Sequence, residues 1–220
     1  MTYHVDVTTT ARRPLTRERV IETAVSYADA HGLEEMSMRK LGTELGVEAM
    51  ALYNHVDNKD DLYDGMIDYV FSEITLADTS LPWREQLRLI GADTLEKFTE
   101  HPWVVLLLCT RGTFGNESLR FTDHIIGILF DAGFSEEDTH HAWQMLASHT
   151  MGYAFQAAFG TDPEDKDFST LEERLPKLAR VVPNVVRISQ QLIDCSWDTE
   201  YLFGLEIILD GLEARIETTQ

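Results

Sequence analysis

The sequence predicts an all-α fold in which a small N-terminal helical domain precedes a larger helical domain. Apolar residues recur at spacings of three and four along nearly the whole chain, as on one face of an α-helix. No run of alternating apolar and polar residues is bounded by hairpin turns, so strands are not expected. With 220 residues, of which 44% are hydrophobic, the chain can form a substantial core.

Within the first seventy residues, N-cap and stop signals predict four helices. Thr16, Ser37 and either Asp57 or Asn58 are suitable N-caps, because their side chains can accept from the free N–H groups of a first turn. Gly46 is a natural stop between two short helices. The expected helices cover residues 16–30, 38–45, 48–55, and 58 into the seventies.

Further helices are expected throughout the rest of the chain. Ser135, followed three residues later by Asp138, resembles a capping box with Asp in place of the usual Glu. Residues 160–183 combine Gly, Pro and many charges, so this stretch is expected to be a mobile connection with a short helix. The expected helices cover residues 82–99, 102–110, 117–131, 135–158, 184–194 and 198–217.

Composition excludes some classes of protein. No run of eighteen apolar residues is present and the N-terminus lacks the apolar stretch of a secretory signal, so no membrane partner is expected and the protein is predicted to be cytoplasmic. The formal net charge of -20 opposes non-specific attraction to phosphate. Cys109 and Cys195 are predicted to be reduced, buried thiols rather than a disulfide or a zinc site.

Residues 41–56 have the pattern of a helix-turn-helix. Leu41 and Leu45 supply an inward apolar face, Gly46 the turn, and Leu52 and Val56 the packing side of a second helix. Two helices of an ordinary bundle that meet at a glycine would give a similar pattern. The residues left facing outward are Glu48, Ala49, Met50, Tyr53, Asn54 and His55.

The outward side chains suit contacts with DNA. Tyr53 can donate to a phosphate, Asn54 can bond adenine through two hydrogen bonds, and Met50 can touch a thymine methyl group. Of the formal charge, residues 1–63 carry only -4, from 7 Lys and Arg against 11 Asp and Glu, whereas residues 64–220 carry -16. Most of the repulsive charge therefore belongs to the C-terminal part.

The stretch LTRERVIETAVSYADAHGLEEMSMRKLGTELGVEAMALYNHVDNKDDLYDGMID resembles the tetracycline-repressor (TetR) family of bacterial transcription regulators, and FGLEIILDGLEARI resembles the end of the family's C-terminal domain. The resemblance implies a homodimer that binds operator DNA and releases it when a small-molecule effector occupies the C-terminal core. It also implies three parts of the chain. These are a flexible N-terminal arm (1–14), a helix-turn-helix DNA-binding domain (15–60) and a regulatory domain for ligand binding and dimerisation (61–220).

Carried onto this chain, the family pattern places Arg39 and Thr43 near the DNA backbone or groove edge and Lys59 at a phosphate. It places Met50, Tyr53, Asn54 and His55 on the recognition helix. Two positions depart from the pattern: Glu48 stands where Ser or Thr is common, and Asn54 where a basic residue is common. Glu48 either accepts from a cytosine amino group or repels DNA.

In the regulatory domain, wide apolar faces on helices 135–158 and 198–217 predict a four-helix dimer interface, with burial inside a monomer as the alternative. The residues predicted for that interface are Trp143, Met151, Phe155, Leu202, Leu205, Leu209 and Leu212. A mainly apolar effector cavity, for a planar or hydrophobic molecule of antibiotic type, is predicted from His101, Trp103, Phe114, Met145, His149 and Tyr153. Each of these residues, taken alone, is also an ordinary core residue.

No catalytic or metal site is predicted. His140 and His141 are adjacent, so on a helix they point about 100° apart and lack the spacing of a metal motif. The chain contains no phosphate loop or nucleophile elbow. No cofactor is expected, and magnesium only as part of a chelated effector. The alternative function is a helical ligand-binding or protein-interaction protein whose operator binding is weakened or lost.

Overall fold

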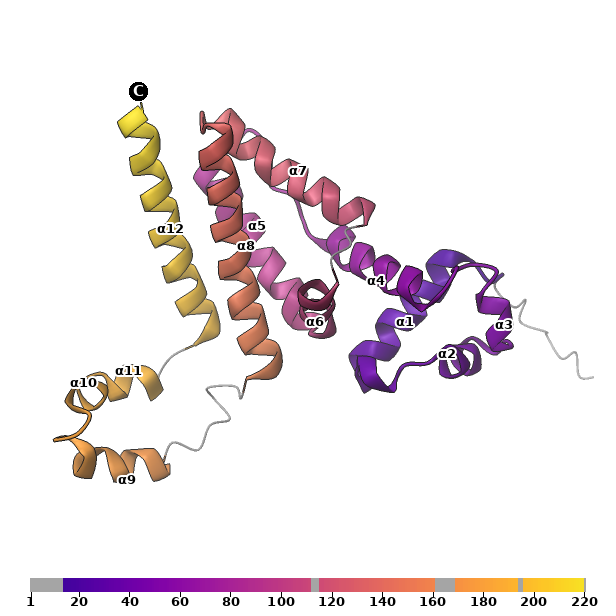
Figure 1. Ribbon diagram of the computed structural model, residues 1–220, viewed down its shortest axis with the longest axis horizontal. Helices are drawn as coiled ribbons and strands as arrows, with labels where there is room; N and C mark the ends of the chain where they lie inside the picture. The colour runs from indigo at the N-terminus through magenta and orange to yellow at the C-terminus, as the bar shows by residue number, and fades with distance from the viewer. Residues whose placement is uncertain (1–13, 112–114, 161–168, 194–195, 220) are drawn as a thin grey trace, which may run out of the picture.

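The computed structural model describes residues 14–111, 115–160, 169–193 and 196–219, and every regular element in these ranges is helical (Figure 1). The all-α prediction is therefore confirmed. The predicted arm, residues 1–14, lies outside the described residues except for Pro14. The elements are α1 (Arg17–His31), the 3-10 helix η1 (Leu33–Glu35), α2 (Met38–Leu45), α3 (Ala49–Leu52), α4 (Lys59–Glu73), α5 (Trp83–Glu100), α6 (Trp103–Thr110), α7 (Asn116–Asp131), α8 (Glu136–Phe159), α9 (Ser169–Leu178), α10 (Pro183–Arg187), α11 (Ser189–Ile193) and α12 (Trp197–Thr219).

The predicted N-caps set the starts of α1, α2, α4 and α8. Thr16, Ser37 and Ser135 each accept a hydrogen bond from the backbone N–H three residues later. Of the two candidates before α4, the structure selects Asn58, whose Oδ1 accepts from the N–H groups of Asp60 and Asp61 at 2.8 and 2.9 Å. Local side-chain chemistry therefore decides where these helices begin.

The turn between α2 and α3 depends on two glycines. Gly46 has φ 66°, in the left-handed region that glycine adopts without strain. Gly42 lies against the backbone of this turn, and a Cβ there would meet Val47 O at 2.9 Å. Leu41, Leu45 and Leu52 are buried in the core, and the turn holds α3 against α2, which itself contacts α1.

The recognition helix is shorter than the predicted span 48–55. Regular α-helix ends at Leu52, and the chain continues in turns in which Asn54 N bonds Ala51 O and His55 N bonds Leu52 O. These bonds span three residues rather than four, so the last turn is wound more tightly than an α-helix. Tyr53, Asn54 and His55 therefore lie in a turn rather than in a continuous α-helix.

The C-terminal body is a bundle in which α8 contacts α5, α6, α7 and α12 (Figure 1). On its outer side, Arg84 of α5 pairs with three carboxylates of α12, Glu206, Asp210 and Glu213, at 3.2, 2.6 and 2.7 Å. Arg88, one turn along α5, also pairs with Glu206. A ladder of ion pairs thus fixes α12 along α5.

Helix α4 belongs to both parts of the molecule, because it contacts α1 on one side and α6 and α7 on the other. Asp68 accepts from the N–H groups of Asn116, Glu117 and Ser118 at 2.8, 3.1 and 3.2 Å and so caps α7 from a distance. Gly115 permits this approach, since a Cβ there would overlap the Asp68 carboxylate.

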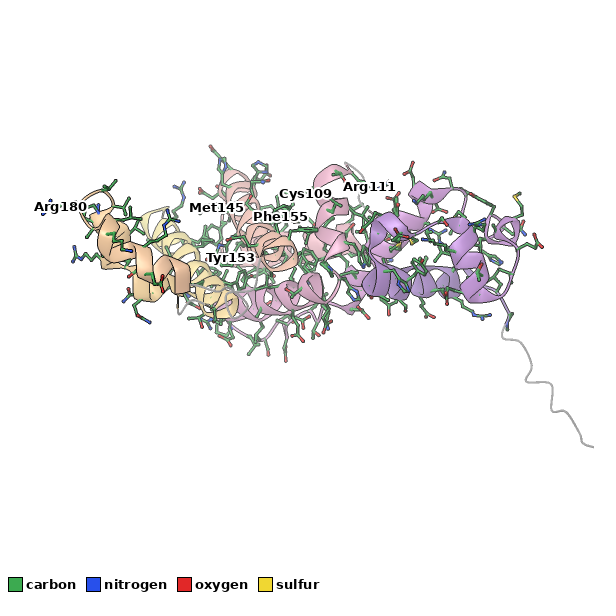
Figure 2. All side chains as sticks on the ribbon, turned by 90° about the horizontal axis from the view of Figure 1, so that it is seen from below. Cys109, Arg111, Met145, Tyr153, Phe155 and Arg180 are labelled. Atoms are coloured by element: carbon green, nitrogen blue, oxygen red, sulfur yellow. The ribbon has the colours of Figure 1, made fainter. Side chains whose placement is uncertain are left out.

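Arg111 provides a second link to α4. Its guanidinium pairs with Asp60 at 2.6 Å and Asp64 at 2.8 Å, and lies over the ring of Tyr63. In Figure 2, Arg111 lies where the body adjoins the DNA-binding domain, and Cys109 lies beside it towards the body. The end of α6 is therefore attached to the start of α4.

The stretch predicted as a mobile connection with one short helix contains α9, and the predicted helix 184–194 is divided into α10 and α11. These three helices contact mainly one another and project from the end of the molecule that is remote from α1, α2 and α3 (Figure 1). No helix among the described residues is long and apolar enough to cross a membrane.

Replacing Asp68 by Ala is expected to lower the free energy of unfolding by about 1–2 kcal/mol, because three N–H groups of α7 lose their acceptor. Urea unfolding followed by circular dichroism measures this change. Glu96→Ala, at an exposed position of α5, is the matched control and should change stability by less than about 0.5 kcal/mol. Equal effects of the two changes would contradict the capping role.

Candidate functional site

The outer surface of α3 and the following turn carries the predicted DNA-contacting side chains. Met50 is 73% exposed and Tyr53 42% exposed, which is unusual for large apolar or aromatic residues with no partner. Glu48 and Asn54 are also exposed, while His55 is half-buried. The side chains of Met50, Tyr53 and Asn54 are therefore available to a partner surface.

The cations around this surface are few and mostly engaged. Arg39 and Thr43 are exposed on α2, and Thr43 Oγ1 donates to Arg39 O at 3.0 Å. Lys40 pairs with Glu35. Lys59 Nζ donates to Met36 O at 3.2 Å and lies over the Tyr63 ring. Arg39 is thus the cation of this group with the greatest freedom to meet a phosphate.

Lys59 lies at the start of α4, as predicted, but side chains of the protein itself already occupy the N-terminus of this helix, where an anion could otherwise bind. Asn58 occupies two of the free N–H groups, and Asp60 and Asp61 lie in the first turn, where the helix dipole favours negative charge. Any contribution of Lys59 to phosphate binding must therefore come from its ammonium group.

We call residues 53–55, which follow α3, the recognition turn. Arg17 and Asp61, which the sequence pattern did not single out, fix the end of this turn. Arg17 donates to both carboxylate oxygens of Asp61, at 2.8 and 2.6 Å, and to His55 O at 3.1 Å. The Arg17 guanidinium holds the pKa of the Asp61 carboxyl below its usual range. A bidentate pair between α1 and α4 therefore orients the chain that follows Tyr53. Arginine and aspartate at these spacings are common on helix surfaces, so the sequence alone gave no signal.

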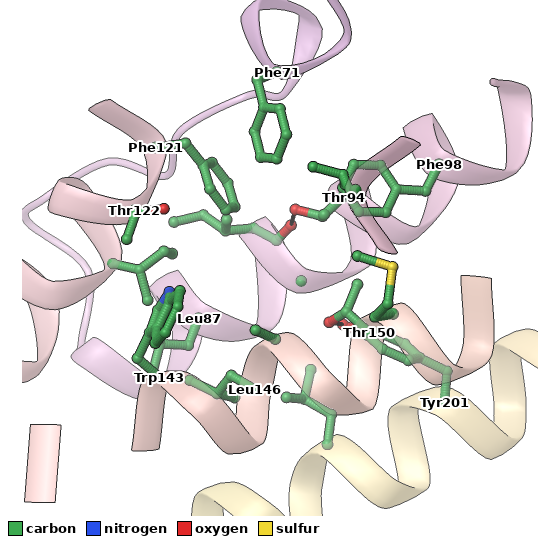
Figure 3. A pocket seen from close by; sticks show the side chains of 17 residues that line it. Phe71, Leu87, Thr94, Phe98, Phe121, Thr122, Trp143, Leu146, Thr150 and Tyr201 are labelled. Atoms are coloured by element: carbon green, nitrogen blue, oxygen red, sulfur yellow. Dashed lines mark hydrogen bonds between the residues drawn. The ribbon is translucent and has the colours of Figure 1, made fainter. Parts of the chain in front are cut away.

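The C-terminal body contains a cavity of about 240 Å³ between α5, α7, α8 and α12, and several aromatic rings line it (Figure 3). We call this the aromatic cavity. No acidic or basic side chain is found in its described lining. The residues that line it are Phe71, Leu87, Ile90, Gly91, Thr94, Phe98, Leu108, Phe121, Thr122, Ile125, Trp143, Leu146, Ala147, Thr150, Met151, Tyr201 and Leu205.

A few hydroxyl groups are the polar features of the aromatic cavity. Tyr201 Oη and Thr150 Oγ1 are 3.0 Å apart, and burial raises the pKa of Tyr201 to about 12. The Tyr201 phenol therefore stays neutral at physiological pH and can donate a hydrogen bond. Thr94 and Thr122 donate instead to Ile90 O and Ser118 O within their own helices.

An open groove of about 510 Å³ adjoins the aromatic cavity between α6 and α8 and shares Leu108, Ala147 and Met151 with it. Cys109 also lines this groove and is exposed, so the predicted burial of this thiol was wrong. Cys109 is exposed because other residues of α6, among them Val104, Val105 and Leu107, form the face that is buried. Cys195 lies outside the described residues.

Two residues predicted for the effector cavity lie instead at the junction of the two domains. Both ring nitrogens of His101 face carboxylates, Nδ1 towards Asp29 of α1 at 2.9 Å and Nε2 towards Glu73 of α4 at 3.0 Å. Trp103 is buried and donates from Nε1 to the same Asp29 at 2.6 Å. Neither His101 nor Trp103 lines the aromatic cavity, because both are committed to this junction.

The other predicted effector residues also lie outside the lining of the aromatic cavity. His149 stacks on Tyr201 and donates from Nε2 to Tyr201 O at 2.9 Å, and Tyr153 packs against both rings. These two residues support the cavity wall from behind. Met145 is 51% exposed on α8. Phe114 lies outside the described residues.

The apolar stripe predicted for the dimer interface is largely occupied within one chain. Leu205, Leu209 and Leu212 are at most 5% exposed, because this face of α12 packs against α5 and α8. Trp143 and Met151, with Leu205, line the aromatic cavity. Leu205, Leu209 and Leu212 are therefore already covered by the single chain, whereas Trp143 and Met151 are half-buried and their place at a dimer contact stays a prediction. Phe155 and Leu202 are exposed, at 49% and 40%.

No cluster of three or more His, Cys, Asp or Glu side chains that could hold a metal ion occurs in the part of the chain that the structure describes. His140 and His141 are neighbours on α8, with ring centroids 5.5 Å apart, and both are exposed.

Comparison with known proteins agrees with this arrangement of a helix-turn-helix domain and a cavity-bearing body. The family model for bacterial regulatory proteins of the tetR family matches residues 20–66, and the model for the tetracyclin repressor-like C-terminal domain matches residues 78–216. The second match alone covers more than half of the chain.

Individual relatives give the same assignment. The HTH-type transcriptional repressor DrrR1 of Streptomyces coeruleorubidus is 30% identical, over 94% of this chain and 83% of that protein. Apo ActR from Streptomyces coelicolor superposes with a TM-score of 0.81 at 25% identity, covering 96% of this chain and all of ActR. ActR in complex with actinorhodin gives 0.77 at 25% identity, over 93% and 99% of the two chains. The chain therefore belongs to the TetR family of bacterial regulatory proteins and is a DNA-binding transcriptional regulator.

Proposed function

We propose that this protein is a homodimeric repressor that reads its operator with Met50, Tyr53 and Asn54 and leaves it when a flat, uncharged aromatic molecule enters the aromatic cavity. The observation that carries the proposal is the pairing of an exposed recognition turn with a neutral, aromatic-lined cavity in one chain. A repressor of chromosomal genes acts in the cytoplasm, and no catalytic step is part of this function.

The lining of the aromatic cavity defines the class of effector. Phe71, Phe98, Phe121 and Trp143 provide ring faces and edges on several sides, which favour a planar aromatic system. The hydroxyls of Thr150 and Tyr201 can bond to a carbonyl or phenol of such a molecule. The solved complex of ActR with actinorhodin supports a small-molecule effector for a protein of this fold.

A magnesium chelate does not fit this cavity. Magnesium in proteins is usually held through carboxylates, and the described lining offers none, nor any imidazole. We therefore propose that the effector binds without a metal ion.

We assign the dimer contact to the apolar faces of α8 and α12 that the single chain leaves exposed. Phe155, Phe159, Phe203 and Ile207 are 49–65% exposed on these neighbouring helices. Large apolar side chains left exposed on packed helices typically mark a protein interface. The proposed interface thus uses the two helices predicted from the sequence. It keeps Phe155 from that prediction and adds Phe159, Phe203 and Ile207.

The alternative, a protein of this scaffold with weakened operator binding, is favoured by Glu48 and by the absence of any Lys or Arg between Lys40 and Lys59. The first experiment below separates the two functions.

Fluorescence anisotropy on DNA segments tiled across the region flanking the gene should reveal saturable binding to one palindrome that fades within a few hundred millimolar salt. Asn54→Ala should weaken binding by about 1–3 kcal/mol, through loss of a bidentate base contact. Absence of any preferred segment at low salt would favour the alternative function.

Glu48→Gln removes one negative charge from the recognition surface, and Glu96→Gln removes one from an exposed site on α5. If Glu48 repels phosphates, Glu48→Gln should raise affinity about threefold at low salt, and Glu96→Gln should have little effect. Weaker binding by Glu48→Gln would instead identify Glu48 as an acceptor from a cytosine amino group.

Ala147→Phe is expected to fill the aromatic cavity without changing the recognition surface. Binding of 1,8-dihydroxyanthraquinone, a flat and uncharged aromatic probe, is followed by tryptophan fluorescence and should weaken at least about tenfold, because the new ring occupies space that the probe needs. Operator binding should persist. Ala92→Phe, at an exposed site on α5, is the matched control. Equal probe binding by both variants would contradict the assignment of the cavity.

Phe203→Glu combined with Ile207→Glu should convert the dimer to a monomer at micromolar concentration, because charged side chains would be buried in an apolar contact. Sedimentation velocity measures this change. Leu119→Glu, on exposed apolar surface of α7, should leave the dimer intact. A dimer that survives the double substitution would place the interface elsewhere.

A further inference from the structure

A second cavity, of about 430 Å³, shares no lining residue with the aromatic cavity. Its walls come from the segment between α4 and α5, the first turns of α5, and a face of α7. We call this the α5–α7 cavity. It is lined by Thr79, Leu81, Trp83, Gln86, Asp123, His124, Gly127, Ile128, Asp131 and Ala132.

Two polar atoms in this wall are buried and have no hydrogen-bond partner among the described residues: Gln86 Oε1 and His124 Nε2. Gln86 is only 7% exposed, and its amide Nε2 is held by Leu81 O at 2.7 Å, which leaves Oε1 as the unused end of the group. Native proteins rarely leave such atoms unpaired, so this wall is built for a polar guest.

The charge of the α5–α7 cavity determines which guest it suits. Asp123 and Asp131 are exposed at its rim, and no Lys or Arg contributes to the described lining. Trp83 adds an indole ring that is fixed by edge-on packing against Phe134, with centroids 5.7 Å apart. Two carboxylates and a tryptophan ring together attract a cation.

The unpaired atoms specify the rest of the guest. Gln86 Oε1 is an acceptor and needs a donor, whereas His124 Nε2 needs a donor or an acceptor according to its tautomer. A hydroxyl group can serve as either. We propose that the α5–α7 cavity binds a small organic cation that carries an ammonium group and hydroxyl groups, as amino alcohols and amino sugars do.

In this arrangement the ammonium group pairs with one of the two rim carboxylates beside the Trp83 ring, and hydroxyl groups reach Gln86 and His124. The site differs from the effector site in position and in chemistry, because the aromatic cavity is neutral and apolar. The proposal therefore does not depend on the nature of the effector.

The test uses serinol, which is glycerol with its central hydroxyl replaced by an amine, added to the full-length protein labelled with ¹⁵N. The indole N–H resonance of Trp83, identified with Trp83→Phe, should shift saturably at millimolar serinol. The resonance of Trp143, which lines the aromatic cavity, should not move. Glycerol should bind at least about fivefold more weakly, because it lacks the charge.

The combined change Asp123→Asn and Asp131→Asn should weaken serinol binding about fivefold or more. Glu136→Gln with Glu137→Gln, two exposed carboxylates at the start of α8, controls for general attraction of cations to an acidic protein. Unchanged Trp103 and Trp143 resonances would show that each variant is folded. Three results would overturn the proposal: equal Trp83 shifts with serinol and glycerol, an equal loss of serinol affinity in both double variants, or no shift of the Trp83 resonance. The cavity would then hold ordered water only.

Discussion

The molecule depends on one face of α4, where Asp60, Asp64 and Asp68 recur every four residues. The first two hold Arg111 at the end of α6, and the third caps α7. On its other side, α4 packs so closely on α1 that a Cβ at Gly65 would lie 2.6 Å from the Ile21 side chain. Helix α4 therefore ties the position of the body to the DNA-binding domain, together with the direct contacts that His101 and Trp103 make with Asp29 of α1.

Much of the fold could be predicted because helix starts are local events. Side-chain caps at Thr16, Ser37 and Ser135 depend on a few neighbouring residues, and these helices begin within a residue of expectation. The recognition helix was predicted too long, and the contacts at its end come from far along the sequence: Arg17 donates to His55 O, 38 residues away, and pairs with Asp61, 44 residues away. Such contacts leave no periodic signal in the sequence.

The site was predicted less well than the fold, and the reason is physical. The sequence shows how wide an apolar face is, but not whether a partner helix, a cavity or a second subunit covers each part of it. Leu205 and Met151 therefore appeared as interface residues although they line the aromatic cavity. His101 appeared as an effector contact because a histidine among aromatic residues gives no sign of the two carboxylates, on α1 and α4, that it meets.

The uneven distribution of charge has a consequence for how the regulator finds its target. With -16 on residues 64–220 and few unpaired cations on the recognition surface, each encounter with arbitrary DNA gains little from counterion release. Binding to such DNA is therefore expected to be weak and brief, so that small molecules compete chiefly with the cognate sequence.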